Sequence, residues 1–64
     1  MSIKKIYYND SFELSFHNNG ENRIYFEIQS IEDEVQYGWI TLDKKDVTCL
    51  IQDLQNLLNE LEDE

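Results

Sequence analysis

The last third of the sequence carries a helical pattern of apolar residues. Asp43 stands where an N-cap belongs, and Asp46 three residues later gives an acidic variant of the capping box. Leu42 before the cap and Val47 at the fourth helical position are typical of a hydrophobic staple. The pattern predicts a helix over residues 44–62. Spacings of three and four residues place seven side chains in one row, here called the leucine row: Val47, Leu50, Ile51, Leu54, Leu57, Leu58 and Leu61.

Upstream of this helix the apolar period changes to two residues. Two triplets alternate with polar neighbours: Phe12, Leu14 and Phe16, then Ile24, Phe26 and Ile28. Their aromatic and β-branched content is typical of strands. Together with the flanking apolar segments, they predict strands over about residues 3–8, 12–17, 22–30 and 34–42.

Loop length decides which strand faces meet. A two-residue turn at Asn19-Gly20 would set an apolar face against a polar one. A three-residue loop over 18–20 avoids this and gives Gly20 the left-handed position. Similar loops over 9–11 and 31–33 complete a meander. The expected cross-strand pairs are Tyr8 with Phe12, Ile6 with Leu14, Leu14 with Ile24, Phe12 with Phe26, Phe26 with Gly38, and Ile24 with Ile40.

The inner face of the last strand has two interpretations. Either Val35, Tyr37 and Trp39 or Ile40 and Leu42 face inward, because the two sets occupy odd and even positions and so lie on opposite sheet faces. The staple role of Leu42 favours the second set. The predicted fold is therefore α+β: a four-stranded antiparallel β-meander with one C-terminal amphipathic α-helix packed on one sheet face.

The other sheet face would then have no cover. Tyr25 and Trp39 are expected to be directly opposed there, and such aromatic pairs stabilise a sheet by roughly 0.2–1 kcal/mol. An antiparallel sheet can also simply face water, but large exposed aromatics are typical of interfaces. We predict a partner-binding or dimer surface here, called the aromatic sheet face: Tyr7, Tyr25, Tyr37, Trp39, Glu13 and Glu27, interleaved with Lys5 and Arg23.

The length and cysteine content restrict how so short a chain is stabilised. Its 64 residues are expected to form one domain, which buries only about 60% of the surface of the unfolded chain. One cysteine forms no intrachain disulfide, and one histidine does not complete a His/Cys metal site. Self-association or a protein partner is the remaining source of stability.

The net charge of −9 makes direct binding to DNA, RNA or anionic lipid unfavourable, even for an aromatic face able to stack bases. Acidity can serve solubility alone, but it also favours association with a basic protein surface. No apolar run has the length of a membrane span, and no signal-peptide core follows the first residues. The unpaired cysteine suits a reducing compartment, so a cytoplasmic location is expected.

A second candidate surface lies on the helix. Asp46, Asp53 and Glu60 recur every seven residues, which separates neighbours by about 10 Å and is expected to place them opposite the leucine row. We call these three residues the acidic helix face. A solvated helix face explains charge there equally well. The more specific interpretation is a row of carboxylates that stands in for nucleic-acid phosphates.

No residues assemble into a recognisable catalytic site. No nucleophile is placed near His17, and the acidic neighbours of Cys49 disfavour its reactivity. Glu32-Asp33-Glu34 lacks the ligand spacing and glycine of a calcium loop. Phosphate-loop, hydrolase and metalloprotease motifs are also missing. We expect a protein that is not an enzyme and needs no cofactor.

Two functional hypotheses remain. The first is a small acidic protein-binding domain that docks a basic, nucleic-acid-binding surface of a target protein. Small acidic inhibitors made by phages and mobile elements have a similar size and charge, which is a likeness of composition only. The alternative is a structural or regulatory homo-oligomer joined through the aromatic sheet face.

Overall fold

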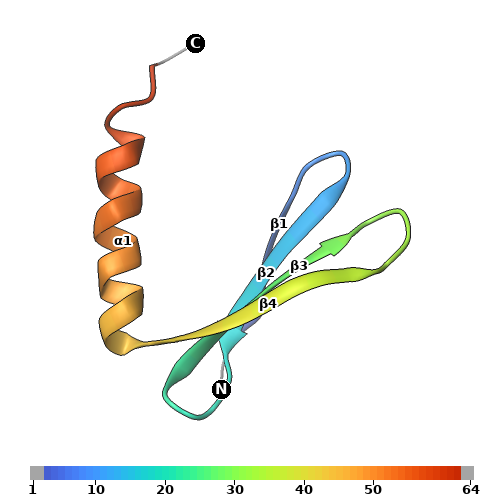
Figure 1. Cartoon of the computed structure of the whole chain (residues 1–64), viewed down its shortest axis with the longest axis horizontal. Coiled ribbons are helices and arrows are strands. Elements are labelled where there is room, and N and C mark those ends of the chain that lie inside the picture. The colour runs from blue at the N-terminus through green and yellow to red at the C-terminus, as the bar shows by residue number, and fades with distance from the viewer. Residues whose placement is uncertain (1–2, 63–64) are drawn as a thin grey trace.

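The computed structural model describes residues 3–62 as a four-stranded antiparallel sheet followed by one helix (Figure 1). Neighbouring strands in the sheet are also neighbours in the chain, so the sheet is the predicted meander. The α+β fold is confirmed, and each strand bound lies within two residues of the predicted one. The elements are β1 (Lys5–Tyr8), β2 (Phe12–Asn18), β3 (Arg23–Ser30), β4 (Gln36–Asp43) and α1 (Lys44–Leu58).

The loop between β2 and β3 lies two residues later than expected. The N–H of Asn19 donates to the carbonyl of Arg23 at 3.0 Å, which closes a three-residue loop over 20–22. Gly20 (φ 85°) and Asn22 (φ 61°) are left-handed there, a conformation that Gly and Asn adopt most readily. Asn22, overlooked in the sequence, therefore takes the last loop position that was expected for Gly20.

The register changes by an even number of residues at β2–β3 and β3–β4. Leu14 lies opposite Ile28 rather than Ile24, and Phe26 lies opposite Ile40. Because side chains alternate with a period of two, an even shift leaves the side chains of β2 and β3, and those of β4 from Gly38 onward, on their predicted faces. Apolar side chains of the three strands therefore still meet on one side of the sheet.

In β1 the register is shifted by one residue, which exchanges its two faces. Tyr7 pairs with Leu14, where Ile6 was expected. Asn9 is the physical reason. Its N–H donates to the carbonyl of Phe12 at 3.0 Å, and its side-chain oxygen accepts two backbone N–H groups of the turn. These bonds close a tighter turn than the three-residue loop expected from the sequence.

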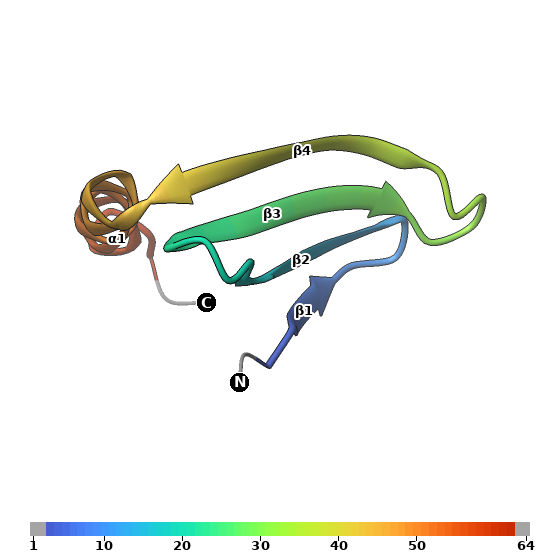
Figure 2. The same ribbon diagram turned by 90° about the horizontal axis from the view of Figure 1, so that it is seen from below.

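The helix begins at the end of β4 and does not lie over a face of the sheet (Figures 1 and 2). Its principal contacts with the described strands are with β4. Val47 and Leu50 are half-buried in its first two turns, whereas the rest of the leucine row is 55–72% exposed. The expected cover of the sheet by the leucine row is thus not formed within one chain. No loop residue separates β4 from α1, so the chain has no segment in which to reverse.

The helix ends at Leu58, four residues before the predicted end. Asn59 is the C-cap, and no basic side chain lies in the last turn. Glu60 and Glu62 follow instead, and carboxylates are unfavourable at the negative end of the helix dipole. No helix within residues 3–62 has the length and apolar composition of a membrane span.

Asp43 is both the last residue of β4 and the N-cap of α1. Its carboxylate accepts the N–H of Asp46 at 2.9 Å. Asp43→Ala is therefore expected to lower the free energy of unfolding by about 1 kcal/mol, measured by urea unfolding followed by circular dichroism. Asp53→Ala removes the same charge from the middle of the helix and is expected to change stability by less than about 0.5 kcal/mol. Equal losses in the two variants would contradict the capping role.

Candidate interaction surfaces

The acidic helix face is only partly helical. Asp46 lies in the first turn of α1 and Asp53 in its middle, about 10 Å apart at 1.5 Å per residue. Glu60 lies beyond the end of α1, in a turn where its N–H donates to the carbonyl of Leu57 at 3.0 Å. All three carboxylate side chains are exposed. The structure thus provides two carboxylates on a helix and a third at its end.

The acidic helix face borders the leucine row rather than lying opposite it, as expected from the sequence. At about 100° per residue, Asp53 lies roughly a quarter turn from Leu54 and next to Leu57, four residues on. The side opposite the leucine row carries Gln52 and Asn56 instead, whose side chains are joined by a hydrogen bond of 3.3 Å. The carboxylates therefore lie at the edge of the apolar row.

Only two of the four aromatics predicted for the aromatic sheet face lie together. The rings of Tyr25 and Trp39 stack, with centroids 5.9 Å apart and planes inclined by 20°. They are diagonal neighbours rather than directly opposed, because Tyr25 pairs with Thr41 and Trp39 with Glu27. The ring of His17 lies on the other side of Tyr25, with centroids 5.4 Å apart.

Polar groups surround this pair of aromatics. The side-chain amide of Gln36 donates to the hydroxyl of Tyr25 at 3.0 Å and to the carboxylate of Glu27 at 2.6 Å. Glu13 and Glu27 are half-buried, whereas 61% of Trp39 is exposed. The face is a small aromatic cluster within polar surroundings.

The other two aromatics lie on the opposite face. Tyr7 stacks on Phe16 with centroids 5.9 Å apart, because the one-residue shift of β1 turns it to that side. Tyr37 lies against Phe12, with centroids 5.5 Å apart, because a bulge interrupts β4. The bulge occurs where the register shifts after Ile28. The four-aromatic surface predicted from the sequence is therefore divided between the two faces.

A larger apolar surface, which the sequence analysis did not treat as a binding surface, occupies the side of the sheet that carries Tyr7 and Tyr37. An apolar groove of about 350 Å³ runs over it, and Leu50 of α1 lines its edge. The even register shifts bring the apolar residues of β2, β3 and β4 together on this side. The alternation of apolar and polar residues in β2 and β3 is the sequence pattern that indicates this surface. We call the following set the apolar sheet face: Leu14, Phe16, Phe26, Ile28, Ile40 and Leu42.

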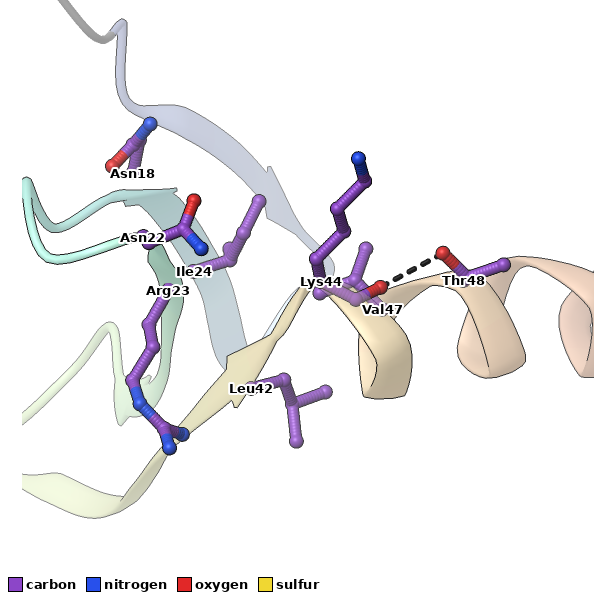
Figure 3. A pocket seen from close by; sticks show the side chains of 8 residues that line it. All are labelled: Asn18, Asn22, Arg23, Ile24, Leu42, Lys44, Val47 and Thr48. Carbon is purple, nitrogen blue, oxygen red and sulfur yellow. Dashed lines mark hydrogen bonds between the residues drawn. The ribbon is translucent and has the colours of Figure 1, made fainter.

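A second hollow, of about 220 Å³, lies where the helix meets the sheet (Figure 3). The cationic groups of Arg23 and Lys44 point in opposite directions there, so they do not converge on an anion. Thr48 donates its hydroxyl proton to the carbonyl of Lys44 at 2.8 Å. Leu42 and Val47, the two residues of the predicted staple, both line this hollow. It forms the junction where the start of the helix packs against the end of the sheet.

Chemically reactive side chains are few and separate. Cys49 is an exposed free thiol, and His17 contacts Tyr25. Within the described range, no group of His, Cys, Asp and Glu side chains is arranged to hold a metal ion. The expectation that the protein is not an enzyme stays a prediction.

Comparison with known proteins gives no relationship on which to build. No family model matches the sequence, and neither a curated protein nor a solved structure is similar to it.

Proposed function

We propose that the chain is a small acidic protein-binding domain whose acidic helix face binds a basic surface of another protein. One observation carries this proposal: α1 projects from the end of the sheet and holds Asp46 and Asp53 exposed along one edge (Figure 1). A projecting helix reaches into a concave partner surface that a flat sheet cannot enter. The net charge of −9 adds long-range attraction to such a surface.

The spacing of the carboxylates fits a row of cationic side chains. Each pairs with a Lys or Arg of the partner, as a nucleic-acid phosphate does in a basic groove. Exposed ion pairs contribute only about 0–1 kcal/mol each, so charge supplies orientation and association rate. An inhibitor of a nucleic-acid-binding protein, of the kind that phages and mobile elements make, is the specific form of this proposal.

Reversing charge on the acidic helix face is expected to abolish capture of the partner. Asp46→Lys/Asp53→Lys changes the net charge by four units, from −9 to −5. The tagged chain is used as bait for the heparin-binding fraction of a nuclease-treated cell lysate. The native chain is expected to retain basic proteins at about 50 mM salt and to release them by about 300 mM, because salt screens exposed charges.

The matched control separates position from total charge. Glu21→Lys/Glu32→Lys makes the same change of four units in two loops and leaves the acidic helix face intact. This variant is expected to retain most of the capture. Equal loss in both variants would show that net charge alone is responsible, and the proposed role of the helix would fail. A native bait that retains no basic protein would also reject it.

A further inference from the structure

The described part of the chain carries two apolar surfaces that do not cover each other. Within residues 3–62 no hydrophobic side chain is buried, and the two buried residues are Ser15 and Ser30. On the apolar sheet face, Ile28 is 46% and Ile40 55% exposed. On the leucine row, Ile51 is 62% and Leu61 72% exposed. Both surfaces have the composition of one half of a hydrophobic core.

The solvent-accessible surface of the chain is larger than that of a compact monomer of the same mass. The chain has an accessible surface of 5801 Å², whereas a compact monomer of its 7.7 kDa mass is expected to have about 4,300 Å². The excess is about 1,500 Å², and a standard interface needs only about 800 Å² from each partner. The radius of gyration, 13.5 Å, likewise exceeds the value of about 11 Å expected for a compact chain of this length.

The connection between β4 and α1 prevents the helix from covering its own sheet. Strand-to-helix connections in compact folds usually have two to six loop residues. Here β4 ends at Asp43 and α1 begins at Lys44, and the bond from Asp46 to Asp43 holds the junction. Short connections of this kind favour exchange of an element between identical chains.

A second copy of the chain can bury both apolar surfaces at once. In a two-fold pair, each copy offers a leucine row and receives one on its apolar sheet face, so neither surface stays exposed. The two surfaces match in character, because the leucine row is built from Leu, Ile and Val and the apolar sheet face from Leu, Ile and Phe. A partner of another sequence would have to supply both complementary surfaces.

We propose that two copies of this chain form a dimer by exchanging helices, with each leucine row packed on the apolar sheet face of the other copy. This interface does not use the stacked ring pair of Tyr25 and Trp39, which lies on the opposite side of the sheet. It leaves Asp46 and Asp53 at its rim. In this dimer the helix no longer projects, so a basic partner would contact Asp46 and Asp53 at the rim of the dimer.

Solution mass gives the first test. Light scattering of the full chain at about 100 µM is expected to give twice the mass of 7.7 kDa. Leu54→Glu/Leu57→Glu, which puts two carboxylates into the leucine row, is expected to remove the dimer. Gln52→Glu/Asn56→Glu adds the same charge on the far side of the helix and is expected to keep it. A monomeric native chain, or equal behaviour of the two variants, would overturn the proposal.

The arrangement is tested on the native chain, which avoids any variant that fails to fold. Labelled and unlabelled copies are mixed, and isotope-filtered NMR detects contacts between copies. Contacts are expected from the methyl groups of Leu54 and Leu57 to the ring of Phe26. If those contacts occur only within one copy, the helix covers its own sheet and the exchange is refuted. Contacts between copies through Tyr25 and Trp39 alone would refute it in favour of the aromatic sheet face.

Salt distinguishes this dimer from the acidic contact proposed above. Two chains of net charge −9 repel each other, so the dimer is expected to strengthen as salt is raised. Binding of a basic partner is expected to weaken under the same change. A dimer that dissociates with added salt would overturn an interface held by apolar contacts.

Discussion

With its ring covered by the leucine row of a second copy, Phe26→Ala is expected to lower the free energy of unfolding by about 3–5 kcal/mol, which is a large part of the stability of so small a protein. Phe26 lies opposite both Phe16 and Ile40 and lines the groove of the apolar sheet face. Its ring centroid is 5.5 Å from that of Phe16. Truncation removes the ring from the centre of this face and also from the surface that receives the leucine row.

The neighbouring aromatic residue provides the control. Tyr25→Ala removes a ring of similar size from the opposite side of the sheet, where it stacks on Trp39. The expected loss is about 1 kcal/mol, because this ring lies in polar surroundings and contributes mainly pairwise contacts. Both variants are measured by urea unfolding followed by far-UV circular dichroism. A larger loss for Tyr25 than for Phe26 would place the core on the other face.

The urea midpoint of the native chain is expected to rise with protein concentration. When folding and association are coupled, mass action stabilises the folded state as concentration increases. A hundredfold increase, from about 1 to about 100 µM, corresponds to about 2.7 kcal/mol per dimer. Fluorescence of Trp39 and circular dichroism are expected to give the same shift.

Leu54→Glu/Leu57→Glu serves as the reference for this measurement. Without the exchange interface, the variant is expected to unfold at a lower midpoint that does not depend on concentration. Gln52→Glu/Asn56→Glu is expected to keep the concentration dependence. A native midpoint that stays constant over the whole range would show that one chain completes its own core.

The type and order of the elements could be predicted from the sequence because their periodicity is strong. The alternation of apolar residues in β2 and β3 and their three-and-four spacing in α1 are local signals. The elements they predicted are present even though the loops lie at other residues than predicted. The loops themselves were harder to predict. Asn9 holds its turn by hydrogen bonds from its side chain, whereas Asn22 holds its turn by a left-handed backbone. Asn is typical of both kinds of turn, so the residue type alone does not fix the position of either loop. A one-residue difference at Asn9 was enough to turn Tyr7 to the other face.

The candidate surfaces were predicted less well, for a related reason. Membership of a sheet face depends on register, which the sequence does not specify where a bulge such as that at Tyr37 occurs. Asp46 and Asp53 of the acidic helix face could be located, because a seven-residue spacing on a helix needs no tertiary information, whereas Glu60 lies beyond the end of α1. Its distance from the leucine row was misjudged, although the angle of 100° per residue already implied it. The open position of α1 depends on the missing loop after Asp43, which a pattern of apolar residues does not reveal.

The exposed leucine row also affects how the chain reaches its folded state. Each strand pairs with its neighbour in the chain, so the sheet forms from local hairpins, which is a fast process. In the proposed dimer, docking of the helices joins two molecules and therefore slows as the protein is diluted. During that interval the apolar surfaces are open to non-specific aggregation. The repulsion between chains of net charge −9 then slows aggregation, because it disfavours loose clusters of chains. The closely packed pair of helices and sheets proposed for the dimer still forms, because its apolar contacts outweigh that repulsion.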